Sequence, residues 1–361
     1  MLGKRPPSPA EAGSSHGLTS LATRHRFDPA TAIKTATMSD SIKIRRCHRS
    51  GFRTPVESTG LQRSETPQPE TPVKPESTHS FDPARYKAEQ RQGWDSVAAA
   101  WKKWRETFER SAQPVSDFLV ELAQIRPGHR VLDVATGTGE PALTAARRVG
   151  PTGRVVATDQ SSQMLAIARE RATALGLQNV EFRQMDAEAL DLPENTFDAV
   201  LCRWALMFFP DLAGCLGRLR LLLIPGGCFA TAVWDVPEKV PMISLTTRVV
   251  TQMLGEPPVP PGTPNPFNLA DTARLERMLA QAGFNDARNT RLTITFEFPS
   301  AEAYVSFRRD VAGPRIPHLV NQPPERQAAV WEALTEAARQ HAAPDGRVRL
   351  PCEVLCVLAR R

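Results

Sequence analysis

The chain lacks a run of about 18 apolar residues, which excludes a membrane-spanning helix from the sequence and favours a soluble protein. Its N-terminus has no compact apolar region, and this excludes a secretory signal peptide. No two of the six cysteines form a CxxC pair, and Cys352 and Cys356 lie four residues apart on an expected strand. These absences favour reduced cysteines in a core, with no metal site and no disulfide framework.

Residues 1–80 differ in composition from the rest of the chain. They include nine prolines and many Ser and Thr, with only scattered apolar residues. Such a segment cannot bury enough apolar surface to offset the entropy lost on ordering, so we predict a disordered tail. The tail is basic, with 12 Lys and Arg against 7 Asp and Glu, whereas the whole chain has 45 against 39. Residues 81–361 are therefore nearly neutral, and their charge gives no reason to expect a nucleic-acid partner.

The tail has two interpretations. Its first 50 residues hold only three acids, Glu11, Asp28 and Asp40, and this is the composition of an organelle transit peptide. The alternative is a plain disordered extension, or a true start at Met38 or later. We accordingly expect the protein in the cytoplasm, or in a mitochondrion or plastid if the tail is a targeting segment.

Residues 81–361 alternate between helical and strand patterns. Apolar residues at three- and four-residue spacing predict helices, and short apolar or alternating runs predict strands. We expect helices over Pro83–Arg110, Val115–Leu122, Glu140–Val149, Ser161–Leu175, Asp211–Leu223 and Thr272–Ala282. We expect strands over Arg130–Val134, Arg154–Thr158, Val180–Arg183, Phe197–Cys202, Cys228–Trp234, Arg291–Phe298 and Glu353–Arg360. This order predicts an α/β fold, a Rossmann-like and mostly parallel seven-stranded sheet with helices on both faces.

A glycine turn follows the first expected strand, in Val131-Leu-Asp-Val-Ala-Thr-Gly-Thr-Gly-Glu140. Gly137 and Gly139 lack a Cβ, so backbone and ligand can approach closely there, and glycine tolerates a positive φ. Asp159 ends the second strand pattern twenty residues after Gly139, at the distance expected for an acid that accepts ribose hydroxyls. These features predict a cofactor that contains adenosine.

Two further acids bear on which cofactor binds. Gly137-x-Gly139-x-x-Ala142 also fits a nicotinamide dinucleotide. However, Asp133 at the mouth of the turn would repel a diphosphate and would suit a cationic amino-acid group. Asp186, at the end of the third strand pattern, is placed to receive the adenine amine, although a helix N-cap is an alternative role. Three acids after three strands favour S-adenosylmethionine.

At these positions the chain resembles the class I S-adenosylmethionine-dependent methyltransferases, in the branch of the ubiquinone/menaquinone-biosynthesis methyltransferases (type 11/25 domain). The resemblance covers about Tyr86 to the C-terminus. It rests on the glycine turn and on the motifs Asp159-Gln-Ser-Ser-Gln-Met-Leu165, Asp186-Ala-Glu-Ala-Leu-Asp-Leu-Pro193, Phe197-Asp-Ala-Val-Leu201 and Leu223-Ile-Pro-Gly-Gly227. Thr136 departs mildly from the family, and Trp204–Asp211 differs from the quinone enzymes. The resemblance implies an antiparallel seventh strand.

Ligands of open α/β sheets lie beyond the carboxyl ends of the strands, which selects one connected rim of the expected sheet. The resemblance also implies that Met164 lies against the adenine. The predicted cofactor-binding residues are Asp133, Ala135, Gly137, Thr138, Gly139, Asp159, Gln160, Met164, Asp186, Ala187 and Arg203.

The acceptor side is expected from what is added to the sheet: the N-terminal helices with Trp101 and Trp104, and substrate-side insertions near residues 235–270 and 300–350. The first insertion contains a stiff proline run, Pro257–Pro261. The tryptophans and Phe208-Phe209 favour an apolar or aromatic acceptor, although helix-spaced aromatics also build cores.

The catalytic base is not identifiable from the sequence. Candidates are His318, in a loop, and Tyr304, Arg308 and Asp310 on the preceding helix. His318 is a weak candidate, because nothing in the sequence fixes a partner for it.

The sequence therefore predicts an enzyme that transfers a methyl group from S-adenosylmethionine to a small apolar or aromatic molecule. The alternatives are a nicotinamide-dependent oxidoreductase, which would use the same glycine turn, and a non-catalytic adenosylmethionine-binding protein, which would keep the rim without an acceptor pocket. The acceptor atom and the oligomeric state are not predicted.

Overall fold

The computed structural model of the chain describes residues 81–255 and 262–361. The predictions of a disordered or targeting tail over residues 1–80 and of a stiff loop at Pro257–Pro261 lie outside the described residues. Within the described part, no helix combines the length and the apolar character that crossing a membrane requires.

A seven-stranded sheet forms the centre of the fold, in the order β3-β2-β1-β4-β5-β7-β6. Neighbours from β3 to β5 pair in parallel, and β7 is antiparallel to both β5 and β6. The strands are β1 (Arg130–Val134), β2 (Arg154–Asp159), β3 (Val180–Gln184), β4 (Phe197–Arg203), β5 (Leu223–Trp234), β6 (Asn285–Phe298) and β7 (Val348–Arg360). The Rossmann-like sheet predicted from the sequence is confirmed.

Continuous apolar runs explain the central strands. Val131, Leu132 and Val134 of β1 are fully buried, because helices cover both faces of the sheet. Val131 pairs with Val155 on one side and with Ala199 on the other, so β1 lies between β2 and β4. The carboxyl ends of these three strands consequently meet at one edge of the sheet.

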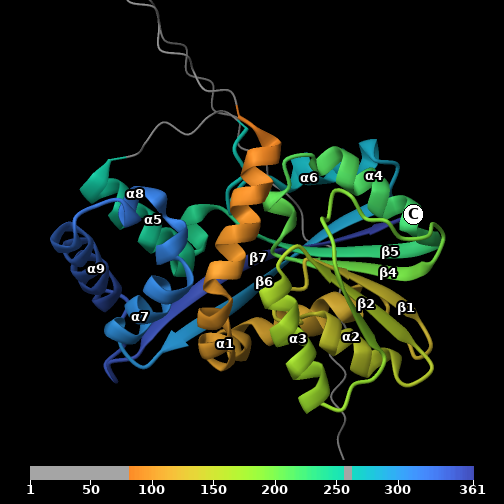
Figure 1. The fold of residues 1–361 in the computed structure, drawn as a ribbon, viewed down its shortest axis with the longest axis horizontal. Coiled ribbons are helices and arrows are strands. Elements are labelled where there is room, and N and C mark those ends of the chain that lie inside the picture. The colour runs from red at the N-terminus through yellow and green to blue at the C-terminus, as the bar shows by residue number, and fades with distance from the viewer. Residues whose placement is uncertain (1–80, 256–261) are drawn as a thin grey trace, which may run out of the picture. The chain divides into compact units, whose positions relative to one another are not determined.

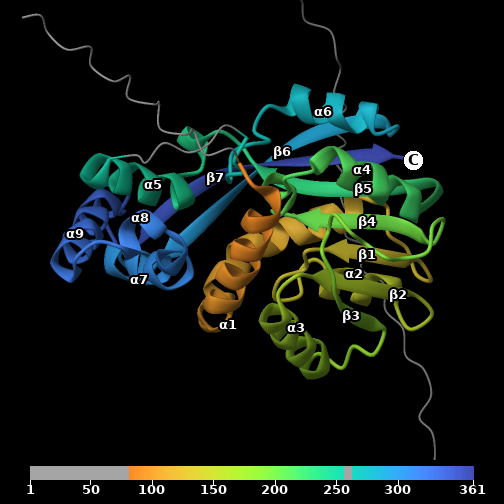
Figure 2. The same ribbon diagram turned by 45° about the horizontal axis from the view of Figure 1, so that its top comes forward.

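Helices form a layer on each face of the sheet, with α1, α2 and α3 on one face and α4 and α6 on the other (Figures 1 and 2). The α-helices are α1 (Pro83–Leu122), α2 (Ala142–Val149), α3 (Ser162–Ala174), α4 (Leu212–Leu222), α5 (Pro241–Leu254), α6 (Thr272–Gln281), α7 (Ala301–Val311), α8 (Pro317–Val320) and α9 (Pro324–Arg339). Three short 3₁₀ helices are η1 (Leu206–Phe208), η2 (Pro237–Lys239) and η3 (Gly313–Arg315).

Local signals set several helix ends. Ser161 accepts a hydrogen bond from the Met164 amide at 3.0 Å and caps α3, and Gly176, with φ +67°, follows the end of that helix. Asp211 caps α4 by accepting from the Gly214 amide at 2.9 Å. Both caps agree with the boundaries expected from the sequence.

Four elements are clearly longer than expected: α1, β6, β7 and β5, which begins at Leu223 instead of Cys228. α1 continues through Pro114 instead of breaking, because Ala112, Val115 and Leu119 around it are fully buried and tertiary packing outweighs the lost hydrogen bond. β6 begins at Asn285, in a polar edge segment without clear alternation. β7 includes Pro351, which lies beyond the last residue paired with β5, so its missing N–H interrupts no bond to that strand.

The helices α5, α7, α8 and α9 gather beyond one end of β6 and β7, and α1 runs between this group and α3 (Figures 1 and 2). They come from the segments between β5 and β6 and between β6 and β7. Cys352 and Cys356 are free and fully buried on β7, in the core beneath this group. The helical group adds a wall to the edge of the sheet where β1, β2 and β4 end.

Candidate functional site

A cavity of about 470 Å³ lies at the carboxyl ends of β1, β2 and β4. The glycine turn after β1 forms its floor, and residues of α1, the loop after β3 and the segment after β4 surround it. The added helices α5 and α7, with η3, close the opposite side. Its position beyond the strand ends is where open α/β sheets bind ligands.

The two glycines of the turn do different things. Gly137 has φ +55° and lines the cavity, and a Cβ added there would meet no atom within 4 Å. Gly139 has φ +110°, and its Cβ would lie 2.9 Å from the Leu143 side chain. Gly137 therefore keeps ligand space open, whereas Gly139 lets the turn pack on α2.

Asp159 joins the turn to the end of β2. Its Oδ2 accepts from the Gly137 amide at 2.8 Å, and its Oδ1 accepts from the Ser161 amide at 2.8 Å. Burial raises the pKa of Asp159 to about 6, although both amides favour its charged form. Each carboxylate oxygen has a second lone pair, so the group still offers acceptor sites to hydroxyls in the cavity.

Asp186 lies on the same rim, after β3. Its Oδ1 accepts from the Glu188 amide at 2.9 Å, and its Oδ2 is 2.5 Å from Lys87 Nζ on α1. Lys87 also pairs with Glu188 at 2.9 Å. The ion pairs of Lys87 thus hold the first turns of α1 against the rim.

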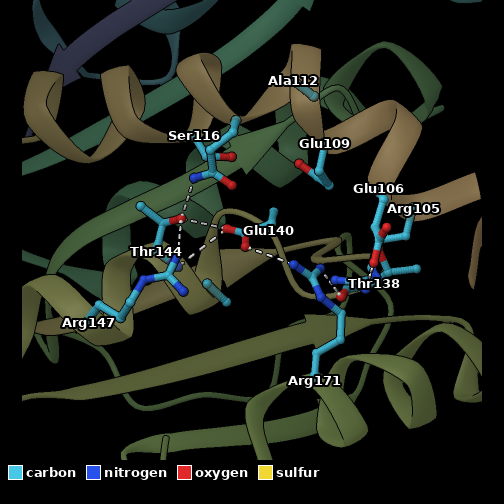
Figure 3. Close-up of polar contacts among 12 residues, drawn as sticks. Arg105, Glu106, Glu109, Ala112, Ser116, Thr138, Glu140, Thr144, Arg147 and Arg171 are labelled. Carbon is cyan, nitrogen blue, oxygen red and sulfur yellow. Dashed lines mark hydrogen bonds and ion pairs between the residues drawn. The ribbon is translucent and has the colours of Figure 1, made fainter. Parts of the chain in front are cut away.

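Glu140, the last residue of the glycine motif, braces the turn from within (Figure 3). Its carboxylate accepts from the Thr144 hydroxyl at 2.7 Å and pairs with Arg171 of α3 at 3.0 Å. Arg171 also donates to the Thr138 carbonyl oxygen at 2.6 Å. The buried pair fixes the turn between α2 and α3.

Arg203, at the end of β4, is held by α1. It pairs with both carboxylate oxygens of Glu109, the shorter distance being 2.7 Å, and donates to the Ser116 hydroxyl at 2.8 Å. Burial opposes the charged form of Arg203, but the Glu109 carboxylate outweighs it and raises the pKa of the guanidinium. Glu109 and Arg203 both line the cavity.

Aromatic side chains form much of the remaining wall. Trp204 and Trp234 stack with ring centroids 4.4 Å apart and an angle of 7° between the rings. Trp101 packs edge-on against Phe108 at 4.9 Å and against Phe307 of α7 at 6.2 Å. The cavity therefore combines a polar rim with an apolar, aromatic wall.

Comparison with known proteins agrees with this arrangement. A family described as a methyltransferase domain matches residues 125–283. The ubiquinone/menaquinone biosynthesis C-methyltransferase UbiE of Teredinibacter turnerae is 38% identical over 122 residues, 34% of this chain and 49% of that protein. The UbiE of Pseudomonas savastanoi pv. phaseolicola is 42% identical over 111 residues, 30% of this chain and 43% of its own length.

These matches identify a methyltransferase domain within residues 125–283 and support the resemblance to class I S-adenosylmethionine-dependent methyltransferases. The cofactor of this family is S-adenosylmethionine. The chain spans less than half the length of these two relatives. Among solved structures, phosphoethanolamine N-methyltransferase 2 of Haemonchus contortus superposes with a TM-score of 0.49 at 17% identity, covering 76% of this chain and 60% of that one.

Most predicted cofactor residues of this methyltransferase line the cavity together: Ala135, Gly137, Thr138, Asp159, Gln160, Met164, Asp186, Ala187 and Arg203. Gly139 and Asp133 do not. Asp133 is fully buried behind the turn, where its Oδ2 accepts from the Ala142 amide at 3.0 Å and its Oδ1 has no hydrogen-bond partner. Burial raises its pKa to about 7. The expectation that Asp133 faces a cationic group at the mouth of the turn is not met in this structure.

His318, the weak catalytic candidate, does not line the cavity either. Its Nε2 lies 2.9 Å from the Leu254 carbonyl oxygen, so the ring joins α8 to α5. Tyr304 donates to the Met242 carbonyl oxygen at 3.1 Å, and Asp310 pairs with Lys103 at 2.7 Å. Of the four candidates, only Arg308 reaches the cavity.

Sequence reasoning missed several lining residues, chiefly on α1 and η3: Tyr86, Gln90, Glu109, Glu140 and Arg315. Trp101, expected on the acceptor side, lines the cavity, whereas Trp104, expected there too, does not. Trp94, to which the sequence analysis gave no role, also lines it. Acids and glutamines on the apolar side of α1 were the available signal, since a helix that only builds core does not need them there.

Proposed function

We propose that this methyltransferase transfers a methyl group from S-adenosylmethionine to a small molecule with an apolar or aromatic body. The observation that carries the proposal is the single cavity with two kinds of wall, a rim of acids beside the glycine turn and an aromatic wall facing it. We also propose that residues 81–361 form the methyltransferase domain, with acceptor-side insertions near 235–270 and 300–350.

The rim fits the cofactor in shape and charge. Open space at Gly137 accommodates the ligand beside the turn, and Asp159 offers acceptor sites to the ribose hydroxyls. Met164 and Asp186 line the same cavity, which supports our proposal that they contact the adenine ring and its amine. We assign these roles, with those of the neighbouring lining residues, to cofactor binding. Gly139 and Asp133 support the turn from behind, the first by packing and the second by accepting from Ala142.

When bound, the cofactor supplies a methyl group on a sulfonium. The acceptor atom uses a lone pair to bond to the methyl carbon, and the pair of the broken sulfur–carbon bond stays on sulfur. Most of the barrier is lowered by holding the two atoms in line. Trp204 and Trp234, as a fixed stack, orient a flat acceptor and exclude water from the reacting atoms.

The chain gives little support to histidine base catalysis. Within the described residues, the lining of the cavity contains no histidine. Its acids are engaged as well. Glu109 pairs with Arg203, Glu140 pairs with Arg171, and Lys87 pairs with both Asp186 and Glu188. Asp159 accepts from two backbone amides. The proposed chemistry thus relies on positioning, and the acceptor loses any proton to solvent or to a group of its own.

The partner we propose is a small molecule and not a nucleic acid, because residues 81–361 carry almost balanced charge. A cytoplasmic or organellar location stays a prediction.

A screen with methyl-labelled cofactor tests the function. Purified protein is incubated with labelled S-adenosylmethionine and metabolite extracts, and labelled products are identified by mass spectrometry. A labelled small molecule that is absent with the Gly137→Val variant supports the proposal. Calorimetry adds a second readout, since saturable binding of NAD without binding of S-adenosylmethionine contradicts the proposal and favours an oxidoreductase.

A further inference from the structure

Two arginines of the added helices line the cavity without an acidic partner. Arg308 lies on α7 and Arg315 on η3. Among the described residues, no carboxylate lies within ion-pair distance of either guanidinium. The other buried arginines at this site are paired, Arg203 with Glu109 and Arg171 with Glu140. The two arginines without an acidic partner, Arg308 and Arg315, therefore lie on the same wall of the cavity.

Arg308 is buried at a high cost in solvation. Arg308 is only 8% exposed, and its Nε donates to the Thr246 hydroxyl at 3.0 Å. Its Nη1 is 3.9 Å from the Met242 sulfur, a weak acceptor. Burial lowers its pKa, and the groups that act against this effect, Tyr304 and Cys352, include no carboxylate. A buried cation without a counter-ion is costly, so folds retain one where a ligand supplies the negative charge.

Arg315 has neutral partners as well. Its guanidinium carbon lies 3.6 Å from the centroid of the Trp94 ring, and its Nη2 donates to Gln90 at 2.6 Å. Burial lowers its pKa to about 10, and the positive charge of Arg308 acts in the same direction. The two guanidinium groups are thus close enough for their charges to repel one another.

Two further donors of the cavity have no acceptor. The indole N–H groups of Trp101 and Trp204 are buried and make no hydrogen bond. Trp101 packs against Phe307, the neighbour of Arg308 in sequence. Unpaired buried donors are rare in folded proteins, and several around one cavity indicate a ligand rich in acceptors.

We propose that the methyl acceptor carries an anionic oxygen group, a carboxylate on an aromatic or apolar body, which Arg308 and Arg315 bind on the wall opposite the glycine turn. This inference rests on the proposed function and narrows its substrate class. The guanidinium groups hold the carboxylate, the tryptophans surround the body of the acceptor, and the far end of the acceptor faces the cofactor. Acids on the rim repel the carboxylate and so set its orientation.

Matched acid and amide probes test the inference. Benzoate, phenylacetate, 4-hydroxybenzoate and octanoate, each beside its amide, are titrated into the full chain saturated with S-adenosylhomocysteine, with tryptophan fluorescence as the readout. We expect at least one acid to bind about tenfold or more tightly than its amide, because charge-assisted hydrogen bonds are the stronger ones. If no acid binds more tightly than its amide, the inference is wrong.

Four variants test which residues cause the acid preference. Arg308→Met removes the acid preference, and Arg308→Lys, which keeps the cation, retains part of it. Arg309→Met is the matched control, because Arg309 is the next residue of α7, is exposed and does not line the cavity. Melting temperatures check that each variant folds. Retention of the full preference in an Arg308→Met, Arg315→Met double variant contradicts the assignment.

The cofactor readout separates this inference from the function on which it rests. Arg308→Met should bind S-adenosylhomocysteine as tightly as the parent chain, and a large loss would mean that Arg308 binds the cofactor and not the acceptor. Acid preference in a protein that binds no S-adenosylhomocysteine would leave the anion site standing and refute the methyltransferase proposal. Binding of S-adenosylhomocysteine without a preference for acids would leave the methyltransferase proposal standing and refute the anion site.

Discussion

The two walls of the cavity differ in origin and in charge. The rim at the strand ends carries the acids Asp159, Asp186 and Glu188, and the cations beside it, Lys87 and Arg203, are paired with acids. The wall from α5, α7 and η3 carries Arg308 and Arg315 and no acid. The rim belongs to the sheet, whose register fixes where each strand stops. The opposite wall belongs to segments inserted between strands.

This difference matches the two ligands that a methyl transfer must bring together. S-adenosylmethionine presents an amine, hydroxyls and an adenine amine, which donate hydrogen bonds, and a positively charged sulfonium. In the proposed function, the acids of the rim accept these hydrogen bonds and attract the positive charge. The basic wall suits a partner of the opposite sign. A cavity whose two walls differ in charge can direct each ligand to its own side without a conformational change, because each wall repels a ligand of the same charge. The predictions below test whether the two walls act separately.

The largest effect is expected at the glycine turn. Gly137→Val should abolish binding of S-adenosylhomocysteine, because its side chain would fill ligand space and a branched residue resists φ +55°. Calorimetry measures the binding. Gly176→Val is the matched control, since Gly176 has φ +67°, equally open surroundings and no place at the cavity. Gly176→Val should strain the backbone but bind the cofactor normally. Normal binding by Gly137→Val would refute the assignment of Gly137 to the cofactor site.

The next effect is expected at the end of β2. Asp159→Ala should weaken binding of S-adenosylhomocysteine by about 2 kcal/mol, roughly thirtyfold, the scale of hydrogen bonds to a charged acceptor. The variant also loses bonds to two backbone amides, so its melting temperature should fall. Asp95→Ala should bind normally, because Asp95 lies on α1, accepts from the Ser161 hydroxyl at the start of α3 and does not line the cavity. Equal binding by Asp159→Ala and the parent chain would show that Asp159 only supports the turn.

A pH effect of intermediate size follows from the raised pKa of Asp159, about 6. The carboxylate form accepts the ribose hydroxyls, and below this pKa a proton competes with the ligand. The dissociation constant should therefore be flat above about pH 7 and rise toward tenfold per unit below about pH 6. Asp159→Asn removes the titrating group, so its weaker binding should not vary over this range. A pH dependence that persists in Asp159→Asn would assign it to another group, such as Asp133.

The smallest effect is expected at His318. His318→Gln should change cofactor affinity and methyl-transfer rate less than about twofold, because its ring contacts the Leu254 carbonyl outside the cavity and the glutamine amide can donate there. Initial rates with the labelled cofactor measure the effect on methyl transfer, and calorimetry measures the effect on cofactor affinity. A loss of rate without a loss of stability would restore His318 as a catalytic residue.

The sequence predicted the rim better than the opposite wall for a physical reason. Gly137, Asp159 and Asp186 follow strands, and parallel strands bring their carboxyl ends together whatever the loops do. Spacing along the chain was therefore enough to place them. It was not enough for Asp133, because sequence position does not tell whether a residue at a strand end faces the ligand or the helix behind the turn.

The residues of the opposite wall depend on tertiary packing. Arg315 reaches the cavity by stacking on Trp94 and bonding Gln90, more than 200 residues earlier in the chain. Glu109 of α1, another lining residue that the sequence did not reveal, is likewise fixed from a distance by Arg203 of β4. No periodicity along α1 or α7 encodes such partners. His318 attracted attention because histidine is a frequent base, and only the structure shows its contact with α5.

If the rim binds the cofactor and the opposite wall binds the acceptor, a substitution in one wall should not change the affinity for the ligand of the other. A comparison of cofactor affinities between two variants tests this separation most directly. Calorimetry measures S-adenosylhomocysteine binding to the parent chain, to Asp159→Ala and to Arg308→Met. The account predicts a loss of roughly thirtyfold for Asp159→Ala and no change for Arg308→Met. Equal losses in both variants, or a loss in Arg308→Met alone, would contradict it.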